Sequence, residues 1–349
     1  MNIFRTWGLT VWKPDEMDGM MSEWLSVKFK WMSILATFAV VGLHSNIGRV
    51  DTQLVQMAYK TFAFAVPTFF LISGWLFVGS VRKYSYVELL KRKFFSLYVP
   101  VVLAALLVMA IVTPMRIYAH EPYNWWEFLR PFGLVFSVGC LHLWYVRALI
   151  VFFILTPIVL FAIRKWPIAA LLMALAAFVP YDAYWYSLNV PRSVFFFLFG
   201  GLLATYIGAA GIEHLSKFWW LEILMGVGLI TAYALQLIHG PVVRIALPLG
   251  EVALLSGLYD FVSSCMMKVS APSGRWDVMF FIYIFHTIIL SYLGGGLRLV
   301  RQWIAIPSDL MFASALATFF ADVFLANILR NRLPRLYGAL TGGRIGAKE

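Results

Sequence analysis

Residues 27–44 read VKFKWMSILATFAVVGLH, an apolar run of helical length that ends in the ionisable side chain of His44. A run of this length and polarity is typical of a helix that crosses a membrane. An ionisable side chain within such a helix is costly to bury and usually serves a function. Histidine titrates near neutral pH, so it can accept a proton and return it. The alternative is that His44 simply ends the helix and reaches water at the membrane surface.

The composition indicates a membrane protein along the whole chain. Hydrophobic residues make up 62% of the 349 residues and charged residues 13%, whereas soluble proteins contain about 25% charged residues. Hydropathy predicts ten transmembrane helices in one all-α polytopic bundle. We expect these helices at about residues 27–47, 57–79, 96–118, 142–163, 167–180, 192–209, 219–238, 244–265, 278–297 and 307–328.

The basic residues predict the orientation of this bundle. With the N-terminus inside, nineteen of the 28 lysines and arginines fall on the cytoplasmic side and seven on the outer side. This bias follows the positive-inside rule, so both termini are expected in the cytoplasm. The net charge of +11 is then explained by topology and by anionic membrane lipids, without nucleic acid.

The remaining organisation is simple. We expect a cytoplasmic N-terminal segment at 1–26 without the pattern of a signal peptide, a transmembrane domain at 27–330 and a basic cytoplasmic tail at 331–349. Cys140 and Cys265 fall on opposite faces of the membrane in this topology, so a disulfide is not expected. No cysteine or histidine spacing predicts a metal site.

Several short motifs follow one another in a distinctive order. They are AVVGLHS around His44, PTFFLISGWLF from Pro67, KRKFFSLYVP from Lys91, HLWYVRAL from His142, FLFGG from Phe197 and FIYIFH ending at His286. In this order and spacing, from about Lys28 to Leu329, they resemble the bacterial membrane-integral acyltransferase-3 family, sometimes described as sugar O-acetyltransferases.

The resemblance implies a reaction and a location. An acyl group, usually acetyl from acetyl-CoA, is transferred to a hydroxyl of a lipid-linked or cell-surface glycan at the bacterial cytoplasmic membrane. His44 matches the histidine that is taken as the catalytic centre in that family. Members commonly carry an arginine eleven residues earlier, about 16 Å along the helix. Here that position is Ser33, and Lys30 is the nearest basic residue on a similar face.

Further side chains are candidates to bind the donor and to orient the catalytic histidine. Arg92 and Lys93 belong to a basic cluster suited to the phosphates of acyl-CoA. Glu251, near the outer end of its predicted helix, matches the expected depth of His44, so we expect it to orient the imidazole. A glutamate at a helix end that faces water is the alternative.

Five residues are candidates to bind the acceptor. His286 and Tyr283 are three residues apart and therefore share a helix face. His142 and Trp144 either contact substrate or belong to an interfacial aromatic belt. Arg147 either binds a phosphate or extends outward to the headgroups.

Two mechanisms and two other functions remain open. One histidine can serve as base and acid in direct transfer, or a covalent acyl-enzyme can form on Ser45, Cys140 or His44. An exporter or flippase of glycans, or another small-molecule transporter, would also have many apolar helices and few buried charges. A membrane scaffold is a third possibility, disfavoured by His44 and His286 within apolar runs. Consumption of acyl-CoA distinguishes a transferase from an exporter.

Overall fold

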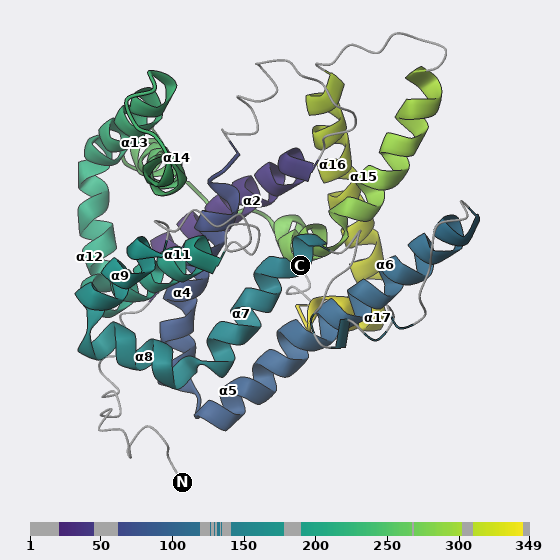
Figure 1. The fold of residues 1–349 in the computed structure, drawn as a ribbon, viewed down its shortest axis with the longest axis horizontal. Coiled ribbons are helices and arrows are strands. Elements are labelled where there is room, and N and C mark those ends of the chain that lie inside the picture. Colours follow the sequence, from purple (N-terminus) through teal and green to yellow (C-terminus); the bar gives the residue numbers. More distant parts are fainter. Residues whose placement is uncertain are drawn as a thin grey trace. The chain divides into compact units, whose positions relative to one another are not determined.

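The structure is a computed structural model, and it describes residues 21–44, 62–118, 126, 129, 131, 132, 134, 141–177, 190–266, 269–301 and 310–344. These residues form helices and connecting turns, and none of them lies in a strand. The all-α prediction is therefore confirmed for the described part of the chain (Figure 1).

The helices follow in this order. The first half contains α2 (Glu23–His44), α4 (Ala65–Lys83), α5 (Tyr86–Lys93), the π-helix η2 (Phe94–Tyr98), α6 (Val99–Tyr118), η4 (Leu141–Leu143), α7 (Trp144–Ile154), α8 (Thr156–Lys165) and α9 (Pro167–Ala176). The second half contains α11 (Val190–Leu202), η5 (Leu203–Ile207), α12 (Gly208–Leu215), η6 (Ser216–Phe218), α13 (Trp219–Ala234), α14 (Pro241–Phe261), η7 (Val262–Met266), η8 (Gly274–Trp276), α15 (Met279–Arg301), α16 (Leu310–Arg332) and α17 (Pro334–Thr341).

Fewer membrane-spanning helices are evident than the sequence predicts. Among the described residues, five helical stretches are long and apolar enough to cross a membrane: Glu23–His44, Ala65–Lys83, Tyr86–Ile111, Ser193–Ala234 and Val242–Met266. A sixth exists if α7 and α8 form one span. The expected number of ten is thus not confirmed.

A bend divides the predicted fourth span. α7 and α8 meet at 75°, and Pro157 is the second residue of α8. Proline has no backbone N–H and clashes with the carbonyl four residues earlier, here that of Phe153. The hydroxyl of Thr156 donates a hydrogen bond to this carbonyl at 2.6 Å. The bend therefore leaves no unsatisfied backbone group at Phe153.

The chain divides into two compact units. Unit 1 comprises residues 1–36, 63–90 and 151–272, and unit 2 comprises 37–62, 91–150 and 273–349. α2 begins in unit 1 and ends in unit 2, where it carries His44.

Unit 1 contains a close contact between α4 and α11. A Cβ atom at Gly74 would lie 1.9 Å from the carbonyl oxygen of Phe197, and one at Gly200 would lie 2.0 Å from that of Leu71. Small residues allow helices in membranes to approach this closely. The neighbouring pair α13 and α14 also packs side by side in this unit (Figure 1).

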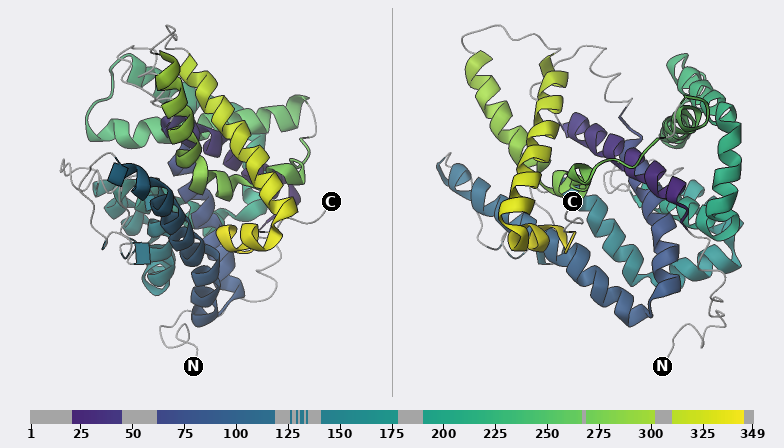
Figure 2. Two further views of the ribbon diagram at one scale, coloured as in Figure 1. Left: turned by 90° about the vertical axis from the view of Figure 1, so that its right-hand side faces the viewer. Right: turned by 180° about the vertical axis from the view of Figure 1, so that it is seen from behind.

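Unit 2 is built around α15. α15 lies beside α16, and α17 packs against α6 (Figure 2). The ring of Phe319 on α16 meets that of Phe38, six residues before His44 on α2, at 5.5 Å between centroids. The contact between Phe38 and Phe319 joins the last part of α2 to α16 within unit 2.

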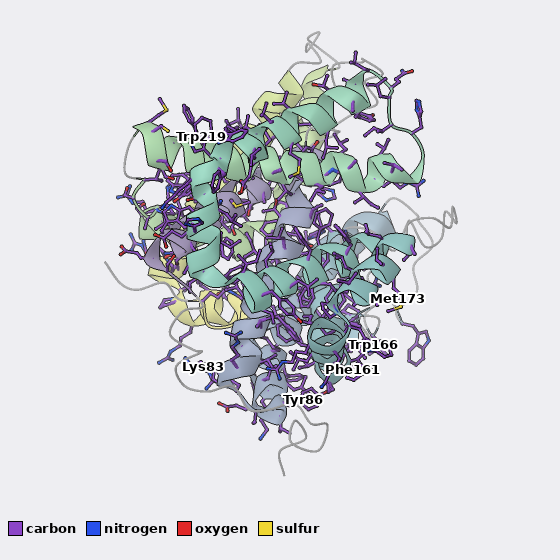
Figure 3. All side chains as sticks on the ribbon, turned by 90° about the vertical axis from the view of Figure 1, so that its left-hand side faces the viewer. Lys83, Tyr86, Phe161, Trp166, Met173 and Trp219 are labelled. Atoms are coloured by element: carbon purple, nitrogen blue, oxygen red, sulfur yellow. The ribbon has the colours of Figure 1, made fainter. Side chains whose placement is uncertain are left out.

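Many large apolar side chains face outward. Trp166 and Met173 are about three-fifths exposed, and both are marked in Figure 3. On α13, Leu224 is exposed to a similar degree. Such extensive apolar exposure is unfavourable in water but natural for helices that face lipid tails.

Candidate functional site

Three histidines meet in unit 2, although they come from distant parts of the sequence. His44 is the last residue of α2, His142 lies in η4 just before α7, and His286 lies in the second turn of α15. The ring centroids are 5.1 Å apart for His44 and His286, 5.0 Å for His142 and His286, and 6.2 Å for His44 and His142. His44 is exposed, whereas His142 and His286 are buried.

Hydrogen bonds to α15 fix His142. The Nε2 atom of its ring donates to the carbonyl oxygen of Ile284 at 2.8 Å. In return, the hydroxyl of Tyr283 donates to the backbone carbonyl of His142. η4 is thus held to α15 at two points, which keeps His142 beside His286.

The backbone also determines the protonation of the two buried rings. The Nδ1 atom of His286 lies 3.0 Å from the carbonyl oxygen of Ile282 and 2.9 Å from that of Tyr283. A carbonyl oxygen can only accept, so Nδ1 carries the proton. The Nε2 atom of neutral His286 is therefore a bare acceptor. By the same argument, Nε2 of His142 carries the proton and Nδ1 is bare.

These two bare nitrogens are chemically unusual. Nε2 of His286 and Nδ1 of His142 are buried and have no hydrogen-bond partner among the described residues. Buried polar atoms without a partner are rare in folded proteins, and they often occur at sites of function. The site thus offers an exposed imidazole, His44, next to two buried proton acceptors. No cluster in the described ranges has the arrangement of a metal site.

The predicted acceptor-binding residues are only partly gathered here. Tyr283 lies beside the cluster, with its ring 6.1 Å from that of His142 and 5.5 Å from that of Tyr145. Trp144 lies two residues after His142 and is half-buried, as is Arg147 one turn further along α7. For these two side chains the substrate role stays a prediction.

Glu251, predicted to orient His44, belongs to the other unit. Glu251 lies on α14 in unit 1 and is buried, whereas His44 belongs to unit 2. The groups that surround His44 in its own unit are the imidazoles of His142 and His286. The role of Glu251 in orienting His44 therefore stays a prediction.

The residues expected to hold the donor fall into both units. Lys30 is exposed and Ser33 is half-buried, and both lie on the part of α2 that belongs to unit 1. Arg92 is exposed and Lys93 is half-buried at the end of α5, and both belong to unit 2. The two basic residues at the end of α5 therefore share a unit with the histidines.

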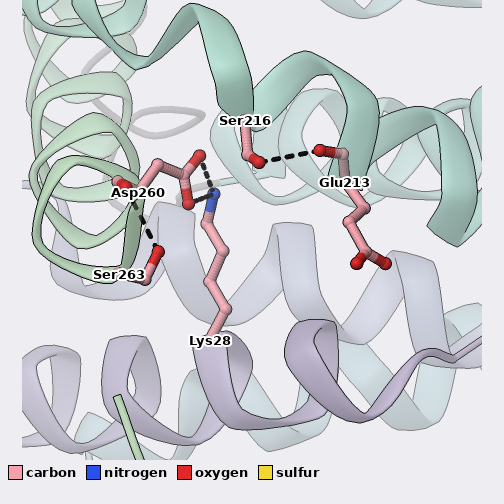
Figure 4. A network of polar contacts seen from close by, with 5 residues as sticks. All are labelled: Lys28, Glu213, Ser216, Asp260 and Ser263. Carbon is pink, nitrogen blue, oxygen red and sulfur yellow. Dashed lines mark hydrogen bonds and ion pairs between the residues drawn. The ribbon is translucent and has the colours of Figure 1, made fainter. Parts of the chain in front are cut away.

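Unit 1 holds an ion pair that the sequence analysis missed. The Lys28 ammonium donates to both carboxylate oxygens of Asp260, at 2.8 and 2.7 Å (Figure 4). Both side chains are buried, and the rings of Trp24 and Tyr259 lie 5.1 and 5.9 Å from the ammonium. A charged residue within an apolar helix needs such a partner. Asp260 lies in an apolar run of the sequence, so its need for a cationic partner could have been predicted.

A cavity of about 210 Å³ lies next to this ion pair in unit 1. Its walls are mostly apolar, with Phe29, Trp75 and Phe199 among them, and its polar side chains are Lys28, Glu222 and Ser256. The Oε2 atom of Glu222 is buried and has no hydrogen-bond partner among the described residues.

Comparison with known families identifies the family of the chain. The family model described as an acyltransferase domain, of the acyltransferase-3 type, matches residues 27–326. The chain belongs to the acyltransferase-3 family. No curated protein and no solved structure matches it. This acyltransferase is a membrane protein, as its apolar helices indicate. The family match includes all three clustered histidines and ends before α17.

Proposed function

We propose that this acyltransferase moves an acyl group, acetyl in the simplest case, from acyl-CoA to a hydroxyl of a lipid-linked or cell-surface glycan. The membership of the family supports acyl transfer. The single observation that carries the proposed mechanism is the pair of bare, buried imidazole nitrogens beside exposed His44.

The proposed reaction begins at His44. A sugar hydroxyl is a poor nucleophile at neutral pH, so a base must take its proton as the oxygen attacks the thioester carbon. The C–O bond forms, the C–S bond breaks, and the proton passes from His44 to the leaving thiolate. The acyl-CoA donor becomes a free thiol, and the sugar hydroxyl becomes an ester. The proton of the hydroxyl ends on the thiol, so His44 returns to its initial state.

The buried histidines support this step by stabilising charge. When His44 takes the proton it becomes an imidazolium with two N–H donors. One donor faces the reaction, and the other requires an acceptor. Nε2 of His286 is such an acceptor, because its Nδ1 atom donates to the backbone carbonyls of Ile282 and Tyr283. The ring of His286 is also nearer to His44 than that of His142 is. Catalytic hydrogen bonds are often long without substrate and shorten when substrate binds.

The test is a measurement of acyl-CoA consumption together with glycan modification. The purified full chain in liposomes is given acetyl-CoA with a labelled acetyl group and a lipid-linked glycan fraction. We expect one free thiol for each label that enters the glycan, in a linkage that mild alkali cleaves as it does an ester. Movement of unmodified glycan across the bilayer without thiol release would instead identify an exporter.

A further inference from the structure

Arg344, in the C-terminal tail, is bound to a carbonyl group 248 residues away in the sequence. Its Nη1 atom donates to the backbone oxygen of Ser96 in η2 at 2.9 Å, and also to the oxygen of Thr341. Pro100 lies four residues after Ser96. Because proline has no N–H, it cannot supply the helical hydrogen bond to that oxygen. The arginine of the tail supplies a donor in its place.

The backbone before Arg344 is shaped for this contact. Gly342 has a φ of +67°, a left-handed conformation that glycine adopts without strain, and it ends α17. A Cβ atom at Gly342 would lie 2.5 Å from the oxygen of Ser96. The guanidinium then lies over the ring of Phe280 at 3.9 Å. The position of the guanidinium is therefore fixed before any ligand binds.

Only part of the guanidinium is used by these contacts. Nη1 serves the two carbonyls, whereas Nε and Nη2 have no hydrogen-bond partner among the described residues, and Arg344 is exposed. None of the carboxylates described in the structure forms an ion pair with it. Burial raises the pKa of nearby Tyr337 to about 12, so this phenol stays neutral and does not compensate the charge.

A second cation lies close to Arg344. Lys93 lies three residues before Ser96, whose backbone oxygen Arg344 binds, and the like charges of its ammonium and the guanidinium repel each other. Two neighbouring cations repel each other, and an anion that contacts both relieves this repulsion. Arginine binds phosphate with two parallel N–H donors, and lysine binds it as a point charge. The free edge of Arg344 and the ammonium of Lys93 thus have the chemistry of a phosphate site.

We propose that Arg344 and Lys93 bind a phosphate of the nucleotide part of acyl-CoA, so that the C-terminal tail contributes to donor recognition. This inference rests on the proposed function. Both residues belong to unit 2, as do the histidines. α17 and Arg344 lie beyond residue 326, where the family match ends. The tail of this chain therefore supplies an arginine for the donor, in a protein that has Ser33 where its relatives commonly have an arginine.

The experiment measures nucleotide binding separately from catalysis. Binding of adenosine 3′,5′-bisphosphate to the full chain in detergent is compared between wild type, Arg344→Gln, Lys93→Gln and Arg332→Gln. Arg332 is an exposed arginine at the end of α16 and serves as the control. We expect the first two variants to bind about tenfold or more weakly, the range for one charge-assisted hydrogen bond. The control should bind as wild type does.

Kinetics then separate donor recognition from a structural role. Acetyl-pantetheine carries the thioester without the nucleotide. Arg344→Gln should raise KM for acetyl-CoA and leave KM for acetyl-pantetheine and kcat unchanged. An equal loss with both donors, accompanied by a lower melting temperature, would show that Arg344 only fastens the tail to Ser96. Unchanged nucleotide affinity together with loss of co-purified phospholipid would assign the site to a lipid headgroup.

Failure of the proposed function is distinguishable from failure of this inference. If wild type binds adenosine 3′,5′-bisphosphate through Arg344 but transfers no acyl group, the phosphate site stands and the transferase proposal does not. If transfer occurs and Arg344→Gln binds the nucleotide as wild type does, the phosphate site is refuted and the transferase proposal stands.

Discussion

The ring centroids of His44 and His286 lie 5.1 Å apart, and the side chain of His286 is fully buried. Because two backbone carbonyls hold the proton of His286 on Nδ1, its Nε2 atom can only accept. Exposed His44 at the end of α2 is therefore accompanied by a proton acceptor whose tautomer is set by the backbone of α15. The following predictions test this arrangement and the fold that supports it.

The ion pair between Lys28 and Asp260 should stabilise unit 1 only as a pair. Lys28→Met leaves a buried carboxylate without its partner, and such a change typically costs about 3–5 kcal/mol. Replacing both, in Lys28→Met with Asp260→Leu, should restore most of that loss. Unfolding in detergent measures the effect, with exposed Lys30→Met as the control. A double variant as unstable as the single one would contradict this prediction.

The glycine contact between α4 and α11 should tolerate no added methyl group. A Cβ at Gly200 would lie 2.0 Å from the carbonyl oxygen of Leu71, so Gly200→Ala must separate the two helices. We expect a loss of about 1–3 kcal/mol, the usual result of overpacking. Gly228→Ala on α13 is the matched control, because nothing lies within 4 Å of its added Cβ. The idea is wrong if both alanines have the same effect on thermal unfolding.

The carboxyl of Asp322 should be neutral. Both of its oxygens are buried on α16 without a hydrogen-bond partner among the described residues. An isolated carboxylate is too costly to bury in an apolar surrounding, so the proton stays on. Asp322→Asn should then change the free energy of unfolding by less than about 1 kcal/mol. A loss of several kcal/mol in thermal unfolding would show instead that the side chain is ionised and paired.

The exposed thiol of Cys265 can report the topology. Cys265 lies in η7 and is exposed, and the basic residues predict that this end of the helix faces the cytoplasm. In a Cys140→Ser background, a membrane-impermeant maleimide should label Cys265 in inverted vesicles and leave it unlabelled in intact cells. Labelling in intact cells would reverse the predicted orientation.

The three clustered histidines could be selected as candidate site residues from the sequence, because each is recognisable by itself. His44, His142 and His286 stand out as ionisable groups in or beside apolar runs, and the structure brings them together. Hydropathy averages over a window, however, so it passed over Pro157 and did not predict the 75° bend between α7 and α8.

Other features depend on contacts that a single sequence does not contain. Glu251 was selected by its expected depth in the membrane alone, and its role stays a prediction. Lys28 is paired with Asp260, 232 residues later, and no local pattern indicates that partner. Arg344 was assigned to a basic tail, and its contact with Ser96 joins residues that are 248 positions apart. Such pairings follow from the packing of helices rather than from local pattern.

The most direct measurement compares acyl transfer by wild type, His44→Ala and His286→Ala at equal membrane abundance, with His239→Ala as a control. His239 is exposed and belongs to unit 1, whereas the clustered histidines belong to unit 2. A general base contributes about 10²–10⁴-fold, so His44→Ala should lose activity by at least that lower factor while the protein stays folded. His286→Ala should lose less activity than His44→Ala, and the His239→Ala control should keep the activity of wild type. Near-full donor-dependent acylation by His44→Ala would contradict the account.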